Sequence, residues 1–154
     1  MRLLFALGAV VVVGSIGAAL YFGERSPIIA SGVITLPQTM VQQAQGMRSL
    51  YIIVRDAKNP MPMPWGALSV TLNKEPSEQV YRFTLTRDNL RIMNPSQEAP
   101  QEIILKARLD VDGLGGGDMP GDIVGVSQPI PFGSNNIDLA LQDLIAETAP
   151  VAGQ

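Results

Sequence analysis

VYRFTLT at residues 80–86 and EIILKARLD at residues 102–110 both alternate apolar and polar side chains. Successive side chains of a β-strand point to opposite faces of the sheet, so a period of two residues predicts strands with one buried face. The side chains predicted to face the core are Tyr81, Phe83, Leu85, Ile103, Leu105, Ala107 and Leu109. These two segments place the chain in the all-β class.

Further strand-like segments, separated by turn residues, are found on both sides of these two. They cover residues 31–36, 50–55, 67–72, 122–132 and 137–141, with Pro129 and Pro131 interrupting the fourth. Short helices are expected at residues 37–45 and 139–147. With no helix long enough for a βαβ crossover, residues 31–145 are predicted to form an antiparallel β-sandwich, immunoglobulin-like or transthyretin-like. Residues 24–30 would then be a linker and residues 146–154 a flexible tail.

Residues 3–22 form an uninterrupted uncharged and mostly apolar stretch. At about 1.5 Å per helical residue it matches the hydrocarbon thickness of a bilayer, and it ends in the interfacial aromatics Tyr21 and Phe22. Its length favours a retained transmembrane helix (residues 1–23) over a cleaved signal peptide. The weak positive bias of Arg2 predicts a single-pass protein of the bacterial inner membrane, with a cytoplasmic N-terminus and a periplasmic domain. The small residues predicted to pack against another membrane helix are Gly8, Gly14 and Gly17.

The composition excludes several classes of chemistry. The chain has no His and no Cys, so it contains no zinc finger, no CxxCH haem attachment site and no Ser-His-Asp or Cys/His nucleophile. Its formal charge of −3 argues against nucleic-acid binding. No paired carboxylates show an acid/base spacing. We therefore expect a non-enzymatic protein that needs no cofactor or metal.

Residues 110–118 combine the carboxylates Asp110, Asp112 and Asp118 with a run of glycines. Hard oxygen ligands on a flexible backbone suit Ca²⁺, although the spacing departs from the EF-hand. A glycine-rich hairpin between two strands explains the same residues. Every Lys and Arg lies at or before Arg108, and all charged side chains after it are acidic. One end of the domain is therefore predicted to be negative.

NPMPMPW at residues 59–65 is the most distinctive local string. Alternate prolines favour an extended backbone, and Met with Trp gives an adaptable apolar surface. Two interpretations are open besides a structural loop: a strip that binds a protein partner, or thioether ligands for Cu(I), with Met93 or Met119 completing the site. The residues predicted to contact a partner are Met61, Met63, Pro64, Trp65, Met119 and Pro120.

Read in order, several strings resemble the C-terminal periplasmic domain of the cytochrome c biogenesis protein family CcmI, also called CycH. They are SGVITL (31–36), LYIIVR (50–55), MP followed by AL (63–68), FTLTRD (83–88), residues 103–108 and MPGDIVG (119–125). The resemblance implies a membrane-anchored accessory protein that binds apocytochrome c or a cytochrome maturation component. Members of that family carry tetratricopeptide repeats before this domain, and those are missing from this sequence. The alternative is a structural accessory subunit of a membrane electron-transfer complex that contains a cytochrome.

Overall fold

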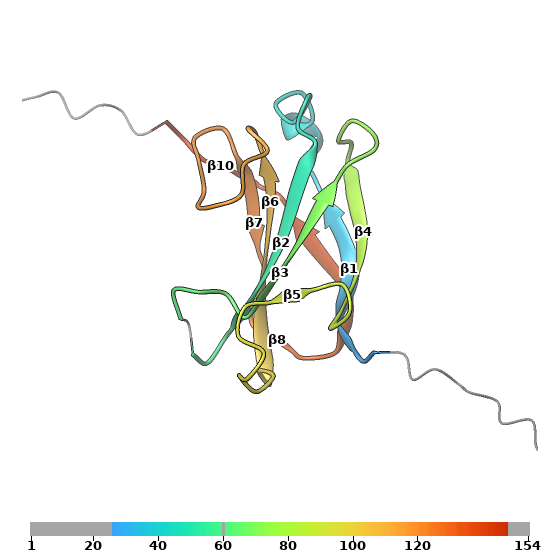
Figure 1. The fold of residues 1–154 in the computed structure, drawn as a ribbon. Coiled ribbons are helices and arrows are strands. Elements are labelled where there is room, and N and C mark those ends of the chain that lie inside the picture. The colour runs from blue at the N-terminus through green and yellow to red at the C-terminus, as the bar shows by residue number, and fades with distance from the viewer. Residues whose placement is uncertain (1–25, 60, 148–154) are drawn as a thin grey trace, which may run out of the picture.

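A computed structural model describes residues 26–59 and 61–147 of the chain. In these residues two β-sheets face each other around one core (Figure 1). The strands are β1 (Ile28–Thr35), β2 (Ser49–Asp56), β3 (Gly66–Thr71), β4 (Gln79–Thr86), β5 (Arg91–Ile92), β6 (Glu102–Asp110), β7 (Ile123–Val126), β8 (Ile130–Pro131), β9 (Ser134–Ala140) and β10 (Asp143–Leu144). A single 3-10 turn, η1 (Gln38–Met40), follows β1. The all-β prediction is confirmed.

The smaller sheet has three strands in the order β4-β1-β9, and the larger has seven, in the order β10-β7-β6-β2-β3-β5 with β8 beside β6. All pairings in the larger sheet are antiparallel. In the smaller sheet β1 is antiparallel to β4 but parallel to β9. The purely antiparallel arrangement expected from the sequence is therefore wrong at this pair, where the first and last long strands of the domain meet.

The core lies between the sheets and is built by the predicted alternation. On β6 the side chains of Ile103, Leu105, Ala107 and Leu109 are fully buried, as predicted. Phe83 and Leu85 of β4 are buried too, whereas Tyr81 is only half-buried. Burial of each large aliphatic or aromatic side chain contributes about 1.5–3 kcal/mol, so this inner layer is the main source of stability.

The chain crosses from the smaller to the larger sheet between β9 and β10. Leu139 and Leu141 are both buried, and the Leu141 amide donates to the Thr35 carbonyl. The helix expected at residues 139–147 is therefore wrong, because tertiary pairing overrides the local helical pattern. A Cβ on Gly125 would lie 2.0 Å from the Ala140 carbonyl oxygen, so the crossing requires glycine there.

Other boundaries differ from the sequence expectation by small amounts. β1 begins at Ile28, inside the expected linker. The expected strand at 122–132 is two strands, β7 and β8, divided before Pro129. The helix expected at 37–45 is reduced to η1 and the turns after it.

The expected membrane segment, residues 1–23, and its packing residues Gly8, Gly14 and Gly17 lie outside the described residues. Within residues 26–59 and 61–147, no helix has both the length and the apolar character needed to cross a bilayer.

Candidate functional site

The outer face of the larger sheet, which points away from the core, carries the most distinctive side chains of the domain. Along β2 the inward residues Leu50, Ile52 and Val54 are fully buried, so Tyr51, Ile53 and Arg55 point outward. Antiparallel pairing sets Tyr51 opposite Arg108, Ile53 opposite Lys106, and Arg55 opposite Ile104. These six residues define the outer face, and two of its arginines each hold a loop.

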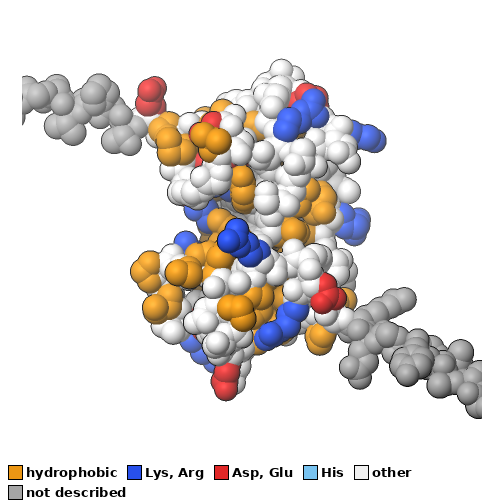
Figure 2. Space-filling view, viewed as in Figure 1, with side chains coloured by type: hydrophobic (Ala, Val, Ile, Leu, Met, Phe, Trp, Pro, Cys, Tyr) orange, Lys and Arg blue, Asp and Glu red, His pale blue; other side chains and the backbone are white. Residues whose placement is uncertain are grey.

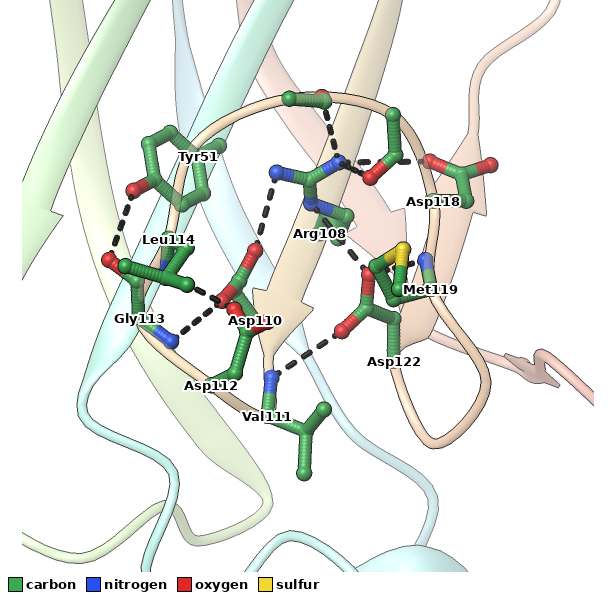
Figure 3. Close-up of polar contacts among 12 residues, drawn as sticks. Tyr51, Arg108, Asp110, Val111, Asp112, Gly113, Leu114, Asp118, Met119 and Asp122 are labelled. Carbon is green, nitrogen blue, oxygen red and sulfur yellow. Dashed lines mark hydrogen bonds and ion pairs between the residues drawn. The ribbon is translucent and has the colours of Figure 1, made fainter.

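At one end of this face the β6–β7 loop (residues 111–122) folds back over Arg108 (Figure 3). The guanidinium Nη1 donates hydrogen bonds to the carbonyls of Gly116 at 2.8 Å and Gly117 at 2.6 Å. The Tyr51 ring covers the guanidinium, with its centroid 4.9 Å from Cζ. Arg108 is consequently only 1% exposed although it lies on the outside of the sheet.

Three carboxylates surround this buried cation. Arg108 Nη2 lies 2.9 Å from Asp110 Oδ2, as an ion pair without hydrogen-bond alignment. Nε lies 3.6 Å from Asp122 Oδ2, and Nη1 lies 3.6 Å from Asp118 Oδ1. Asp118 is also paired with Lys106, whose Nζ donates to Oδ1 at 2.6 Å. Charges out of water persist only when they are paired and hydrogen-bonded. Arg108 is paired with all three carboxylates and donates two hydrogen bonds to carbonyls, but its Nε and Asp110 Oδ2 make no hydrogen bond among the described residues.

Asp122 closes the loop at both ends. Its Oδ1 accepts from the backbone amide of Val111 at 3.0 Å, and its Oδ2 accepts from the amide of Met119 at 2.8 Å (Figure 3). The carboxylate is fully buried, so these charge-assisted bonds are screened little by solvent. The loop is thus fixed to the sheet by Arg108, which precedes it, and by Asp122, its last residue.

The surroundings of Asp110 favour the neutral form of its carboxyl group. Burial raises the pKa of Asp110 above its ordinary value, and the side chain of Asp112 raises it further. The backbone amide of Gly113, 2.6 Å from Asp110 Oδ1, and the charge of Arg108 lower the same pKa. The desolvation of Asp110 is the largest of these effects.

These contacts change two expectations from the sequence. The acidic residues after Arg108 were expected to be unopposed, but Asp110, Asp118 and Asp122 are paired with Arg108 and Lys106, so this prediction is wrong for them. Of the carboxylates considered as calcium ligands, Asp110 and Asp118 are paired with the guanidinium of Arg108, and Asp112 accepts from the backbone amide of Leu114. Within the described residues no three acidic side chains form a group that could hold a metal ion. The hairpin interpretation describes this loop.

At the other end of the outer face the β2–β3 loop (residues 57–65) is held by Arg55. Its Nη1 donates to the carbonyls of Met61 at 3.2 Å and Pro62 at 3.5 Å. The methionine side chains project into solvent, with Met61 54% and Met63 62% exposed. Pro64, which follows them, is partly buried. The part of the predicted strip that can contact a partner is therefore Met61 and Met63, supported by prolines.

Trp65 is not part of that exposed strip. Its side chain is 2% exposed and meets Phe132 edge to face, with ring centroids 5.9 Å apart. The guanidinium of Arg87 lies over the indole, 5.8 Å from its centroid. The assignment of Trp65 to a partner surface is corrected: a large aromatic next to a strand is drawn into the core, where it buries the most apolar area.

Met119 and Pro120 are exposed, but in the β6–β7 loop. β2 and β6 pair in register from Ser49 with Asp110 to Asp56 with Ile103, a length of roughly 25 Å at about 3.4 Å per residue. Met61 and Met63 lie at one end of this ladder and Met119 at the other. Met119 therefore belongs to a different loop from Met61 and Met63.

The exposed apolar side chains gather around the larger sheet. Among the described residues the large hydrophobic side chains that are exposed are Ile28, Met61, Met63, Val111, Leu114, Met119, Val126 and Leu144. All of them except Ile28 belong to strands or loops of that sheet. Figure 2 shows the surface hollowed between the end that carries β7 and β10 and hydrophobic side chains at the position of the β2–β3 loop. Sequence reasoning missed Val126 and Leu114, because their exposure depends on strand register and loop direction.

No protein-family model matches the chain, and neither a curated protein nor a solved structure is significantly similar to it.

Proposed function

We propose that this protein is a non-catalytic accessory module that binds a polypeptide across the outer face of its larger sheet. The observation that carries the proposal is the concentration of exposed apolar side chains on this one sheet, with only Ile28 elsewhere in the described residues. Exposed apolar side chains that gather on one part of a protein are typical of interaction sites.

The two loops at the ends of the outer face suit such a role. Met61 and Met63 offer flexible, polarizable side chains that adapt to different partners. Their backbone is stiffened by alternate prolines and held by Arg55, which reduces the entropy lost when a partner binds. Leu114 and Met119 present apolar side chains from the loop held by Arg108. A partner that spans the face would contact both loops.

For the partner we propose apocytochrome c or another component of c-type cytochrome maturation, with the domain held on the periplasmic side of the bacterial inner membrane by residues 1–23. The support is the resemblance of residues 31–132 to the CcmI (CycH) domain and the apolar character of the N-terminal segment. An immunoglobulin-like topology belongs to the same proposal, since two packed sheets with alternating inward residues are its architecture.

The test is site-specific photocrosslinking of the full chain in cells. A photoreactive residue replaces Met63 in one strain and Asp138, on the outer side of the smaller sheet, in a matched control strain. We expect crosslinks from position 63, and not from 138, to an apocytochrome or a maturation component. Crosslinks of equal yield at both positions, or unchanged levels of haem-stained cytochromes after deletion of the gene, would contradict the proposal.

A further inference from the structure

β4 is an edge strand of the smaller sheet. It pairs with β1 on one side, and within the described residues no strand pairs with its other side (Figure 1). Unpaired N–H and C=O groups on an edge are a template for another backbone. The contacts of Asn89 show which of these groups point away from β1.

The side chain of Asn89 already occupies part of this edge. Its Nδ2 donates to the Thr84 carbonyl at 2.8 Å, and its Oδ1 accepts from the Thr86 amide at 2.9 Å. The carbonyl of Thr84 and the amide of Thr86 therefore point away from β1. Backbone groups alternate in direction along an antiparallel strand, so the amide and carbonyl of Arg82 point the same way. Asn89 makes two bonds that a neighbouring strand would make, and the edge before Thr84 stays open.

β3 forms a second open edge, on the same side of the sandwich as β4. β5 pairs with β3 only at Gly66 and Ala67, and the Leu72 amide donates to Arg48, toward β2. By the same alternation, the backbone groups of Ser69 and Thr71 point away from β2. β5 is too short to cover them.

The space between these two edges has an apolar floor. Leu68 and Val70 of β3, and Val80 and Tyr81 of β4, are partly buried and pack against the core. The ends of the two strands line a common depression, to which Thr71, Leu72, Gln79, Val80 and Tyr81 contribute. Figure 2 shows hydrophobic side chains in the region of β3 and β4. Exposed backbone groups and a hydrophobic floor are the two features that strand addition uses.

The charge of Arg82 disfavours a second copy of this chain at the β4 edge and favours an acidic partner segment. Arg82 is exposed and makes no ion pair with any residue that the structure describes. Suppose that β4 paired antiparallel with β4 of a second copy of this chain, around the open segment. The two Arg82 side chains would then be close neighbours on one face of the sheet, and like charges so placed are destabilising. A segment with a carboxylate at that position gains the opposite interaction.

We propose that the β4 edge, residues 80–84, binds an extended segment of a partner polypeptide as an added strand. The segment would carry an acidic side chain beside Arg82 and apolar side chains at alternate positions, toward Tyr81 and β3. The site is separate from the outer face of the larger sheet, so this proposal shares with the proposed function only the polypeptide nature of the partner.

The test is selection from a displayed library of random heptapeptides against the full chain. We expect enriched peptides to alternate apolar and polar residues and to contain Asp or Glu. Arg82→Pro removes an outward amide that β1 does not use, a position at which edge strands tolerate proline. It should weaken binding about tenfold or more, whereas Arg82→Ala, which keeps the amide, should weaken binding only about threefold. Unfolding by urea checks that each variant is folded.

Amide hydrogen exchange locates the bound peptide. In the free chain the amides of Arg82 and Thr84 should exchange quickly and those of Phe83 and Leu85 slowly, and the selected peptide should protect the first pair. Protection elsewhere, equal affinity of Arg82→Pro, or protection that arises from self-association would overturn the inference. If crosslinking from position 63 failed while these amides were protected, the outer-face proposal would fall and strand addition would stand.

Discussion

The β6–β7 loop and the β2–β3 loop are both held to the same sheet face by an arginine that donates to two of their carbonyls, yet the two attachments differ in physical character. Arg108 is covered by the loop and by Tyr51, with three carboxylates around it. Among the residues that the structure describes, the Arg55 side chain makes two long hydrogen bonds, to the carbonyls of Met61 and Pro62, and no ion pair. One attachment is a buried charge network and the other is a solvent-exposed contact.

The difference indicates separate roles for the two loops. A buried network stabilises one conformation strongly, because losing any member leaves an uncompensated charge. A partly buried arginine that makes two long hydrogen bonds without a counter-charge contributes less to stability and holds its loop less firmly. We infer that the β6–β7 loop has one fixed conformation. The β2–β3 loop is held more weakly, and it adapts to a partner through its exposed methionine side chains rather than through its proline-stiffened backbone. Three substitutions test this contrast.

Arg108→Met should have the largest effect. It removes the cation but keeps much of the side-chain volume, and it leaves Asp110 and Asp122 buried without a counter-charge. Breaking a buried ion pair on one side costs about 3–5 kcal/mol, so we expect the free energy of unfolding to fall by about that amount. Urea denaturation of the full chain measures it. A loss below about 1 kcal/mol would show that the network does not fix this loop.

Asp110→Asn should have a smaller effect that depends on pH. Burial raises the pKa of Asp110 in the folded state, so above the ordinary pKa of an aspartate the folded protein retains a proton that the unfolded chain has lost. Asp110 therefore makes the folded state less stable as pH rises from the ordinary value through the raised one. The variant lacks this titration, and its free energy of unfolding relative to wild type should increase over the same interval. Denaturation curves across a pH series measure the difference, and a difference that falls with pH would contradict the assignment.

The sequence predicted the strands better than it predicted the site. Alternation alone identified the inward side chains of β6, because a period of two residues is a local signal. The parallel pairing of β1 with β9 has no such signal, since it joins segments about a hundred residues apart. The sequence therefore predicted the strands at both ends of the domain but not their parallel pairing.

Arg108 shows why the outer face could not be predicted. On an alternating strand it counts as an outward, solvated residue, and its burial depends on a loop that returns over the sheet. A signal was nevertheless present: Arg108 and Asp110 are two residues apart on one strand face, directly before a glycine-rich loop. Trp65 was misassigned for the opposite reason, because the methionines shortly before it in the sequence are exposed while it enters the core.

Arg55→Met is the matched control for Arg108→Met, since it makes the same chemical change on the same face of the same sheet. The bonds of the Arg55 side chain within the described part of the chain go to carbonyls of a loop whose methionines face solvent. We expect the free energy of unfolding to change by at most about 1 kcal/mol, as for exposed polar contacts. The substitution should instead loosen the β2–β3 loop, measured as faster amide exchange in residues 57–65 with unchanged exchange in residues 111–122. A loss of stability as large as that from Arg108→Met would abolish the distinction between a fixed and an adaptable loop.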